Sequence, residues 1–163
     1  MTTINNEVQK PDDATLIIKR ILNASPEKAF KVWTTAEHIQ QWMKPDPAMV
    51  VPSASMDLRV GGKFRIQMKN PDGEFFTAAG VFREVKAPEK LVYTWDWEKD
   101  GGGPEFGELE GKESLITVEF LKRGDKTEFV MTHSRFATVE SRDNHGKGWT
   151  TGVDSFVKFV EGK

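Results

Sequence analysis

The chain has 163 residues, of which 37% are hydrophobic and 29% charged, with a formal net charge of −2 and no cysteine. One domain with a core fits this length, while the weakly acidic balance excludes a basic nucleic-acid surface and the lack of cysteine excludes disulfides, thiolate catalysis and cysteine-ligated zinc. Neither an apolar run of roughly 20 residues nor a signal-peptide core is present, so the sequence predicts a cytoplasmic protein without membrane insertion.

The N-terminal third predicts a tail, one strand and two short helices. Residues 1–13 have no hydrophobic periodicity, and we expect a flexible tail there, followed by a single domain over residues 14–163. Residues 15–22 are rich in β-branched and apolar side chains, which predicts a strand. Ser25 and Pro26 indicate a helix start, because serine caps helices and proline suits their first position. A second helix is expected to open at Thr35 and to end before Pro45.

Six further strands are predicted after these helices. Their approximate ranges are 48–60, 63–69, 74–86, 90–98, 113–123 and 126–134. Within 63–69, the apolar residues Phe64, Ile66 and Met68 face one way, and Arg65 and Gln67 between them face the other. The glycine- and acid-rich segment between the fourth and fifth of these strands is expected to be a loop.

The last segment, residues 138–161, changes to helical periodicity. Apolar residues recur there at the spacing of one helix face, including Trp149, Val153 and Phe156. A shorter helix that starts near Lys147 is the alternative. Glycines within the segment, such as Gly148, indicate that a neighbouring chain segment approaches the helix closely.

The order of these elements predicts the fold class. No strand–helix–strand alternation occurs, which disfavours a parallel sheet. An antiparallel sheet of this size with one amphipathic helix is expected to wrap that helix, so that their apolar sides meet. We therefore predict an α+β fold: a curved antiparallel sheet, two short helices after the first strand, and a long C-terminal helix in the concavity.

Several motifs in this order resemble a known family. They are Ser25–Thr34, Trp42, Asp57–Phe64, Pro88–Trp95 and His145–Trp149. Together they resemble single-domain bacterial proteins similar to the C-terminal domain of the activator of the heat-shock-protein-90 ATPase, within the START-like, birch-pollen-allergen-like superfamily (SRPBCC). The resemblance covers about residues 15–161. It implies the helix-grip fold and a cavity between sheet and helix, but no particular activity, because this superfamily includes lipid carriers, hormone receptors, polyketide cyclases and co-chaperone domains.

Aromatic and apolar residues on the facing sides of sheet and helix are the candidate ligand-binding residues. They either fill the core or line a cavity for a small hydrophobic molecule. The predicted set is Trp42, Phe64, Ile66, Tyr93, Trp95, Trp97, Ile116, Val118, Phe129, Met131, His133, Trp149, Val153 and Phe156. Trp95 and Trp97 lie nearest the following loop and are the better candidates for the cavity mouth. Trp42 is interpreted either as a staple between the short helices and the sheet or as a gate.

Polar candidates are fewer. His133 shares the inward face of its strand, either as a hydrogen-bonded core histidine or as a group that orients a ligand. Asp57 and Arg59 are expected to point outward and pair with neighbouring strands, whereas an inward Arg59 would anchor a ligand carboxylate. Acidic residues over 96–113 are expected to be mostly solvated, and the loop 100–111 to be mobile or a lid over the cavity mouth. No catalytic residue, metal site or cofactor is assigned.

Three functions remain open from the sequence. The first is the binding of a small apolar or lipid-like molecule without catalysis. The second is a cyclase- or hydrolase-type enzyme that uses a polar group of the cavity, and the third is a module that binds a chaperone or another protein through the outer face of the sheet. A monomer and a homodimer are both compatible with an exposed sheet edge.

Overall fold

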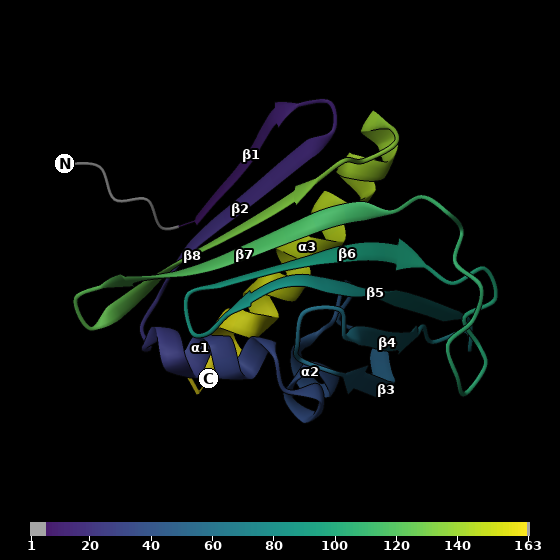
Figure 1. The fold of residues 1–163 in the computed structure, drawn as a ribbon, viewed down its shortest axis with the longest axis horizontal. Helices are drawn as coiled ribbons and strands as arrows, with labels where there is room; N and C mark the ends of the chain where they lie inside the picture. The colour runs from purple at the N-terminus through teal and green to yellow at the C-terminus, as the bar shows by residue number, and fades with distance from the viewer. Residues whose placement is uncertain (1–5, 163) are drawn as a thin grey trace.

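The structure is a computed structural model that describes residues 6–162, with side chains from Glu7 onward. Eight strands form one antiparallel sheet in the order β1-β2-β8-β7-β6-β5-β4-β3 (Figure 1). The elements are β1 (Asn6–Asp12), β2 (Thr15–Leu22), α1 (Pro26–Trp33), α2 (Ala36–Trp42), β3 (Val50–Met56), β4 (Lys63–Lys69), β5 (Phe75–Lys86), β6 (Lys90–Trp97), β7 (Ser114–Arg123), β8 (Lys126–Ser134) and α3 (Val139–Val160).

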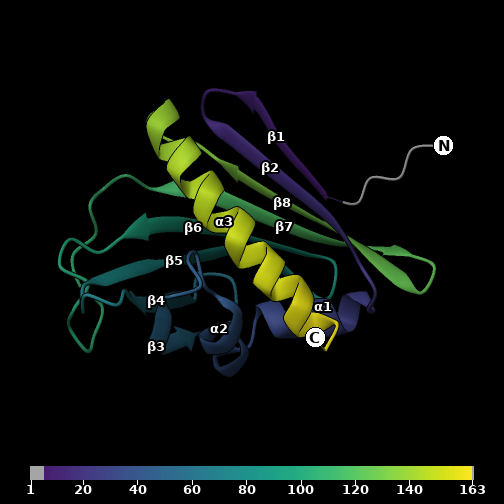
Figure 2. The same cartoon turned by 180° about the vertical axis from the view of Figure 1, so that it is seen from behind.

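Helix α3 lies across one face of the curved sheet, and α1 and α2 lie beside its C-terminal half (Figure 2). The predicted α+β helix-grip fold is confirmed. Its core forms because the strands alternate: β2 and β8 bury every second side chain, and these face the apolar side of α3. Among the helix residues, Trp149, Val153 and Phe156 are buried against the sheet, as their spacing predicts.

The long form of the C-terminal helix is correct, and the alternative start near Lys147 is wrong. Thr138 caps α3, because its side-chain oxygen accepts a hydrogen bond from the Ser141 N–H at 3.0 Å. Gly148 lies where the helix approaches the segment after α2: a Cβ atom at this position would lie 3.1 Å from Cβ of Pro45. Glycine therefore permits a close contact that a larger residue would push apart.

The expected tail over residues 1–13 is wrong for Asn6–Asp12, which forms the edge strand β1. Val8 pairs with Ile18 of β2, so the segment is held by backbone hydrogen bonds rather than by an apolar face. Lys10 also forms an ion pair of 3.0 Å with Asp143 of α3. Residues 1–5, the rest of the predicted tail except Asp13, lie outside the described residues.

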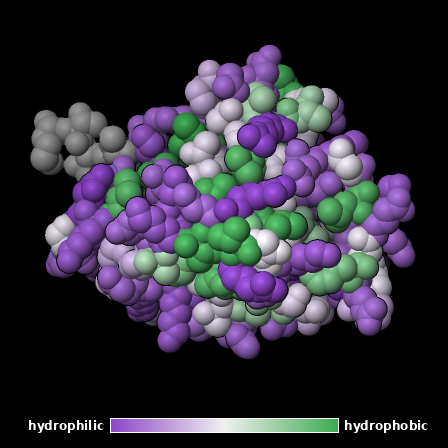
Figure 3. Space-filling model, in the orientation of Figure 1, coloured by the Kyte–Doolittle hydropathy of each residue, from purple (hydrophilic) through white to green (hydrophobic). Residues whose placement is uncertain are grey.

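The face of the sheet that is turned away from α3 is mainly hydrophilic, with apolar side chains in groups among the polar ones (Figure 3). Asp57 and Arg59 are exposed in the β3–β4 connection. They form an ion pair with each other at 2.8 Å, so the prediction that they pair with neighbouring strands is wrong. Because Arg59 is exposed, the alternative in which it anchors a ligand from inside the sheet is wrong as well.

Candidate functional site

A cavity of about 420 Å³ lies between the N-terminal half of α3 and the β4–β6 part of the sheet. We call it the apolar cavity, because most of its walls are methionine and aromatic side chains. Its lining residues are Met43, Pro45, Met49, Met68, Phe76, Trp95, Trp97, Asn144, His145, Gly148 and Trp149. The volume falls in the range of roughly 300–1,000 Å³ that is usual for small-molecule sites.

Strand pairing places the sheet side of this cavity. Met68 of β4 is paired with Phe76 of β5, and both point to the α3 side. Trp95 and Trp97 of β6 point to the same side, because they are two residues apart on one strand. The wall opposite the sheet comes from α3 and from the connection between α2 and β3. Phe76 is 44% exposed, so the cavity opens to solvent beside this ring.

A second cavity of about 350 Å³ adjoins the first. We call it the polar cavity, because Glu110, Lys112, Glu140 and several hydroxyl side chains contribute to its walls. The two cavities share four lining residues, namely Trp95, Trp97, Asn144 and His145. The shared wall contains a hydrogen bond from Trp97 Nε1 to His145 Nε2 at 3.1 Å. An apolar chamber and a more polar one therefore meet at a wall of side chains.

His133 is a hydrogen-bonded core histidine and is fully buried. Its Nδ1 accepts a hydrogen bond from Trp149 Nε1 at 3.0 Å, so Nε2 carries the proton and donates to Ser114 Oγ at 2.7 Å. Ser114 in turn donates to the Trp95 carbonyl at 3.1 Å. Burial, followed by the nearby His145, lowers the pKa of His133 well below its ordinary value. Both ring nitrogens are thus engaged, which leaves the neutral imidazole no free position for proton transfer.

His145 is held in the neutral form in a similar way. The Ser141 carbonyl is an acceptor only, so His145 Nδ1 donates to it at 2.8 Å and Nε2 accepts from Trp97. Burial lowers the pKa of His145, and the hydrogen bond to Ser141 opposes this shift. The apolar cavity therefore has no charged side chain in its wall at neutral pH.

The predicted binding residues divide into three groups. Three of them line the apolar cavity: Trp95, Trp97 and Trp149. Three others, Phe64, Ile66 and Tyr93, lie around a space of only about 10 Å³ nearer to α1. The rest line none of these spaces and fill the core: Trp42, Ile116, Val118, Phe129, Met131, Val153 and Phe156, while His133 forms the hydrogen bonds described above. Their inward direction is as predicted, and contact with a ligand stays a prediction.

Eight of the lining residues are not among the binding residues predicted from the sequence. They are Met43, Pro45, Met49, Met68, Phe76, Asn144, His145 and Gly148. Two signals were available for some of them: Met68 continues the apolar face of Phe64 and Ile66, and His145 lies one helical turn before Trp149. No local sequence pattern predicts that the connection after α2 packs against α3, because these segments are about a hundred residues apart in the chain.

Trp42 lies in the packed core and not at a cavity wall. It is fully buried, and its Nε1 donates to the Val32 carbonyl at 3.1 Å. The ring packs against Trp33 at 4.7 Å and Phe156 at 5.0 Å between centroids. This is the position of a staple between the short helices and α3, rather than of a gate.

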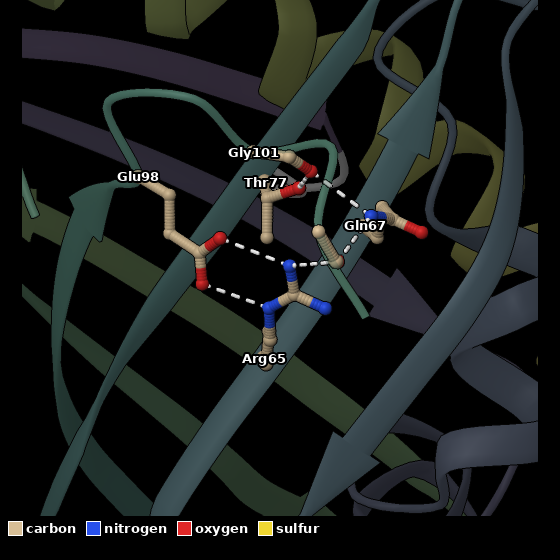
Figure 4. Close-up of polar contacts among 6 residues, drawn as sticks. Arg65, Gln67, Thr77, Glu98 and Gly101 are labelled. Carbon is tan, nitrogen blue, oxygen red and sulfur yellow. Dashed lines mark hydrogen bonds and ion pairs between the residues drawn. The ribbon is translucent and has the colours of Figure 1, made fainter. Parts of the chain in front are cut away.

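On the opposite face of the sheet, behind the cavities, a polar cluster holds the β6–β7 loop (Figure 4). Arg65 and Glu98 form a two-bonded ion pair at 2.8 and 2.9 Å, and both are buried. The Gly101 carbonyl accepts hydrogen bonds from Gln67 and Thr77. Glu98 is therefore an exception to the expectation that the acidic residues over 96–113 are mostly solvated. Residues 101–103 cover the outer face of the sheet instead of forming a lid over the cavity mouth.

The chemistry of this cluster is structural. Burial opposes ionisation of Glu98, but hydrogen bonds from Arg65 and the Gly107 N–H outweigh it and lower the pKa of the carboxyl. A carboxylate that is ionised and fully paired is a poor general acid. Across residues 6–162, no group of three or more His, Asp or Glu side chains is arranged to hold a metal ion. None of the helices in the same range is long and apolar enough to cross a membrane.

Comparison with known families gives one match over most of the chain. A family model described as Activator of Hsp90 ATPase homolog 1-like protein matches residues 23–161. This range includes both cavities and excludes only β1 and β2 among the elements of the fold. No curated protein matches the chain.

Solved structures share the fold at low sequence identity. A protein from Rhodobacter sphaeroides has a TM-score of 0.79 at 18% identity, covering 98% of this chain and 100% of its own. The AHSA1 protein from Silicibacter pomeroyi has a TM-score of 0.77 at 24% identity, covering 90% and 97%. An AHSA1-like protein from Aeromonas hydrophila has a TM-score of 0.70 at 22% identity, covering 90% and 92%. At these identities the likeness establishes the fold, and not the ligand or the activity.

Proposed function

Because the chain belongs to the family of Activator of Hsp90 ATPase homolog 1-like proteins, whose fold commonly encloses hydrophobic ligands, we propose that it binds one small hydrophobic or lipid-like molecule. The proposed site is the apolar cavity, with Trp95, Trp97 and Trp149 as the main aromatic contacts. The proposal assigns no catalytic step to this site.

The observation that carries this proposal is the contrast between the cavity and the rest of the interior. Beside α1 and α2, aromatic rings are in direct contact, and the space between these helices and the sheet measures only about 10 Å³. Beside Trp95 and Trp97 the same layer contains about 420 Å³ lined by apolar side chains, with access beside Phe76. Covering this surface with an apolar molecule is favourable by roughly 25 cal/mol per Å² buried.

The side chains around the cavity favour binding over proton-transfer catalysis. His133 and His145 each use both ring nitrogens in hydrogen bonds to protein groups. General acid–base catalysis needs a titratable group within hydrogen-bond reach of the substrate and with a pKa near the working pH. The lowered pKa values of both histidines move them away from that range.

A neutral fluorescent probe, N-phenyl-1-naphthylamine, tests the proposal. We expect the fluorescence of the probe to rise on binding. We also expect energy transfer from the excited tryptophans of the cavity wall to the bound probe. Met49 is half-buried in the wall, so Met49→Trp adds bulk to the cavity without changing the sheet. This substitution is expected to weaken probe binding at least tenfold, whereas the matched control Met49→Leu keeps a similar volume and is expected to bind within about twofold of the unchanged protein.

A second blocking variant separates the cavity from other apolar surfaces. Asn144 is exposed at the rim shared by both cavities, so Asn144→Trp places a ring across the rim, while Asn144→Gln serves as its control. Thermal unfolding establishes that each variant is folded. Equal probe affinity in Met49→Trp, Asn144→Trp and the unchanged protein would place the bound probe elsewhere and overturn the proposal.

A further inference from the structure

The chain has five tryptophans, and we compare whether the indole N–H of each has a hydrogen-bond acceptor. Four of them do. Trp33 donates to Tyr93 Oη at 3.2 Å, Trp42 to Val32 O at 3.1 Å, Trp97 to His145 Nε2 at 3.1 Å, and Trp149 to His133 Nδ1 at 3.0 Å. Trp95 is only 3% exposed, and over residues 6–162 its Nε1 has no hydrogen-bond partner. A buried donor without an acceptor costs roughly 1–3 kcal/mol.

This unpaired donor belongs to a residue in the wall of both cavities. The backbone of Trp95 is already satisfied, because β6 is paired with β7 and its carbonyl accepts a hydrogen bond from Ser114. Its ring is fixed by Trp149, at 5.2 Å between centroids, and by Phe64, at 6.0 Å. The indole N–H itself is covered by neighbouring side chains, so a ligand in the adjoining cavity can supply the missing acceptor once a side chain of the wall moves aside. The flexible methionines of the cavity wall allow such a movement.

The charges around the site indicate which acceptor fits. The walls of the apolar cavity hold no Lys or Arg, and its one titratable residue, His145, is kept neutral. The polar cavity has Glu110 and Glu140 against a single Lys112. A ligand carboxylate at Trp95 would be buried without a cation in the apolar cavity and would face an excess of negative charge beyond it, which is unfavourable.

We propose that the ligand is a neutral apolar molecule with a carbonyl oxygen, as in a ketone, ester or amide, which accepts a hydrogen bond from Trp95 Nε1. This inference rests on the proposed binding function and narrows it to a chemical class. The apolar body of the ligand occupies the apolar cavity, and the carbonyl lies against the wall shared with the polar cavity.

Three compounds of nearly equal shape test the inference: 2-acetylnaphthalene, 2-isopropenylnaphthalene and 2-naphthoate. The first two differ by a carbonyl oxygen in place of a methylene group, and the third carries a charge. In calorimetric titrations, we expect the ketone to bind three- to tenfold more tightly than the alkene, the usual effect of one hydrogen bond. The carboxylate is expected to bind more weakly than the ketone. In Trp95→Phe, which removes the donor, ketone and alkene are expected to bind equally.

Nuclear magnetic resonance gives a second measurement that needs no substitution. The indole proton of Trp95 is expected to shift downfield with the ketone and not with the alkene, while the indole protons of Trp33 and Trp42, which are already bonded in the core, stay in place. Equal affinities of ketone and alkene in the unchanged protein, without this shift, would overturn the inference and leave the proposed function intact. If none of the three compounds binds, the inference fails as well, and the N-phenyl-1-naphthylamine titration then decides whether the cavity binds apolar molecules at all.

Discussion

The two ends of the space between α3 and the sheet contain similar side chains but differ in packing. At the end beside α1, Phe156 contacts Trp33 at 4.9 Å and Trp42 at 5.0 Å between ring centroids, and every indole donor has an acceptor. At the other end, Trp95 and Trp97 lie around a cavity of about 420 Å³, and the indole N–H of Trp95 has no acceptor among the described residues. Aromatic composition is therefore equally compatible with a filled core and with a binding site.

The elements that cover each end explain the difference. Helices α1 and α2 bring large rings against the C-terminal half of α3. Its N-terminal half is covered by the connection between α2 and β3, where Pro45 approaches the helix at Gly148. Residues 43–49 of this connection include no aromatic residue that could fill the space. The cavity is also lined by Met43, Met49 and Met68, whose flexible side chains adapt to ligands of different shapes.

The largest expected effect on stability comes from a substitution at the packed end, beside α1. Phe156 is fully buried, so Phe156→Ala removes a ring whose space the surrounding rings cannot fill. We expect it to lower the free energy of unfolding by about 3–5 kcal/mol, measured by urea denaturation. Phe76→Ala at the cavity mouth is the matched variant, and since that ring is 44% exposed, we expect a loss of about 1 kcal/mol or less. Equal losses would mean that the two ends are packed alike.

The next largest effect on stability is expected from substitutions in the Arg65–Glu98 ion pair, on the outer face of the sheet behind the cavity. Arg65 and Glu98 hold the β6–β7 loop against the strands whose inner faces line the cavity (Figure 4). Arg65→Met leaves a buried carboxylate without its partner, and we expect a loss of about 3 kcal/mol in urea denaturation. The double variant Arg65→Met with Glu98→Leu removes both charges and is expected to recover part of this loss. If the double variant is no more stable than Arg65→Met alone, the loss in Arg65→Met does not come from the unpaired charge of Glu98.

The sequence predicts the packed end better than the cavity end, for a physical reason. Alternation along β6 and helical spacing along α3 place Trp95, Trp149 and Phe156 on the inside, because those periods follow from backbone geometry. Whether rings on facing elements touch or leave space depends on the separation of elements far apart in the chain, as at Gly148 and Pro45. The burial of Arg65 cannot be predicted from the sequence for the same reason. Alternation places its side chain on the outer face of the sheet, and only the folded β6–β7 loop covers that face.

The smallest expected effect is a pH dependence at the boundary between the two ends, where His133 and His145 accept hydrogen bonds from Trp149 and Trp97. Both histidines have a pKa below the ordinary value in the folded protein, mainly because of burial. The unfolded chain therefore binds more protons below about pH 6.5, so the stability that is complete above this pH falls as the pH decreases. We expect a decrease of up to about 1.4 kcal/mol per pH unit for each histidine between pH 6.5 and 5.5, above the main titration of the carboxylates.

Urea denaturation across this pH range measures the slope, and His145→Gln tests its origin. This substitution removes one titrating ring while keeping an acceptor for the Trp97 indole. The slope is then expected to fall, with the remainder coming from His133. An unchanged slope would assign the pH dependence to other groups and would mean that protonation of His145 does not oppose its bond to Trp97.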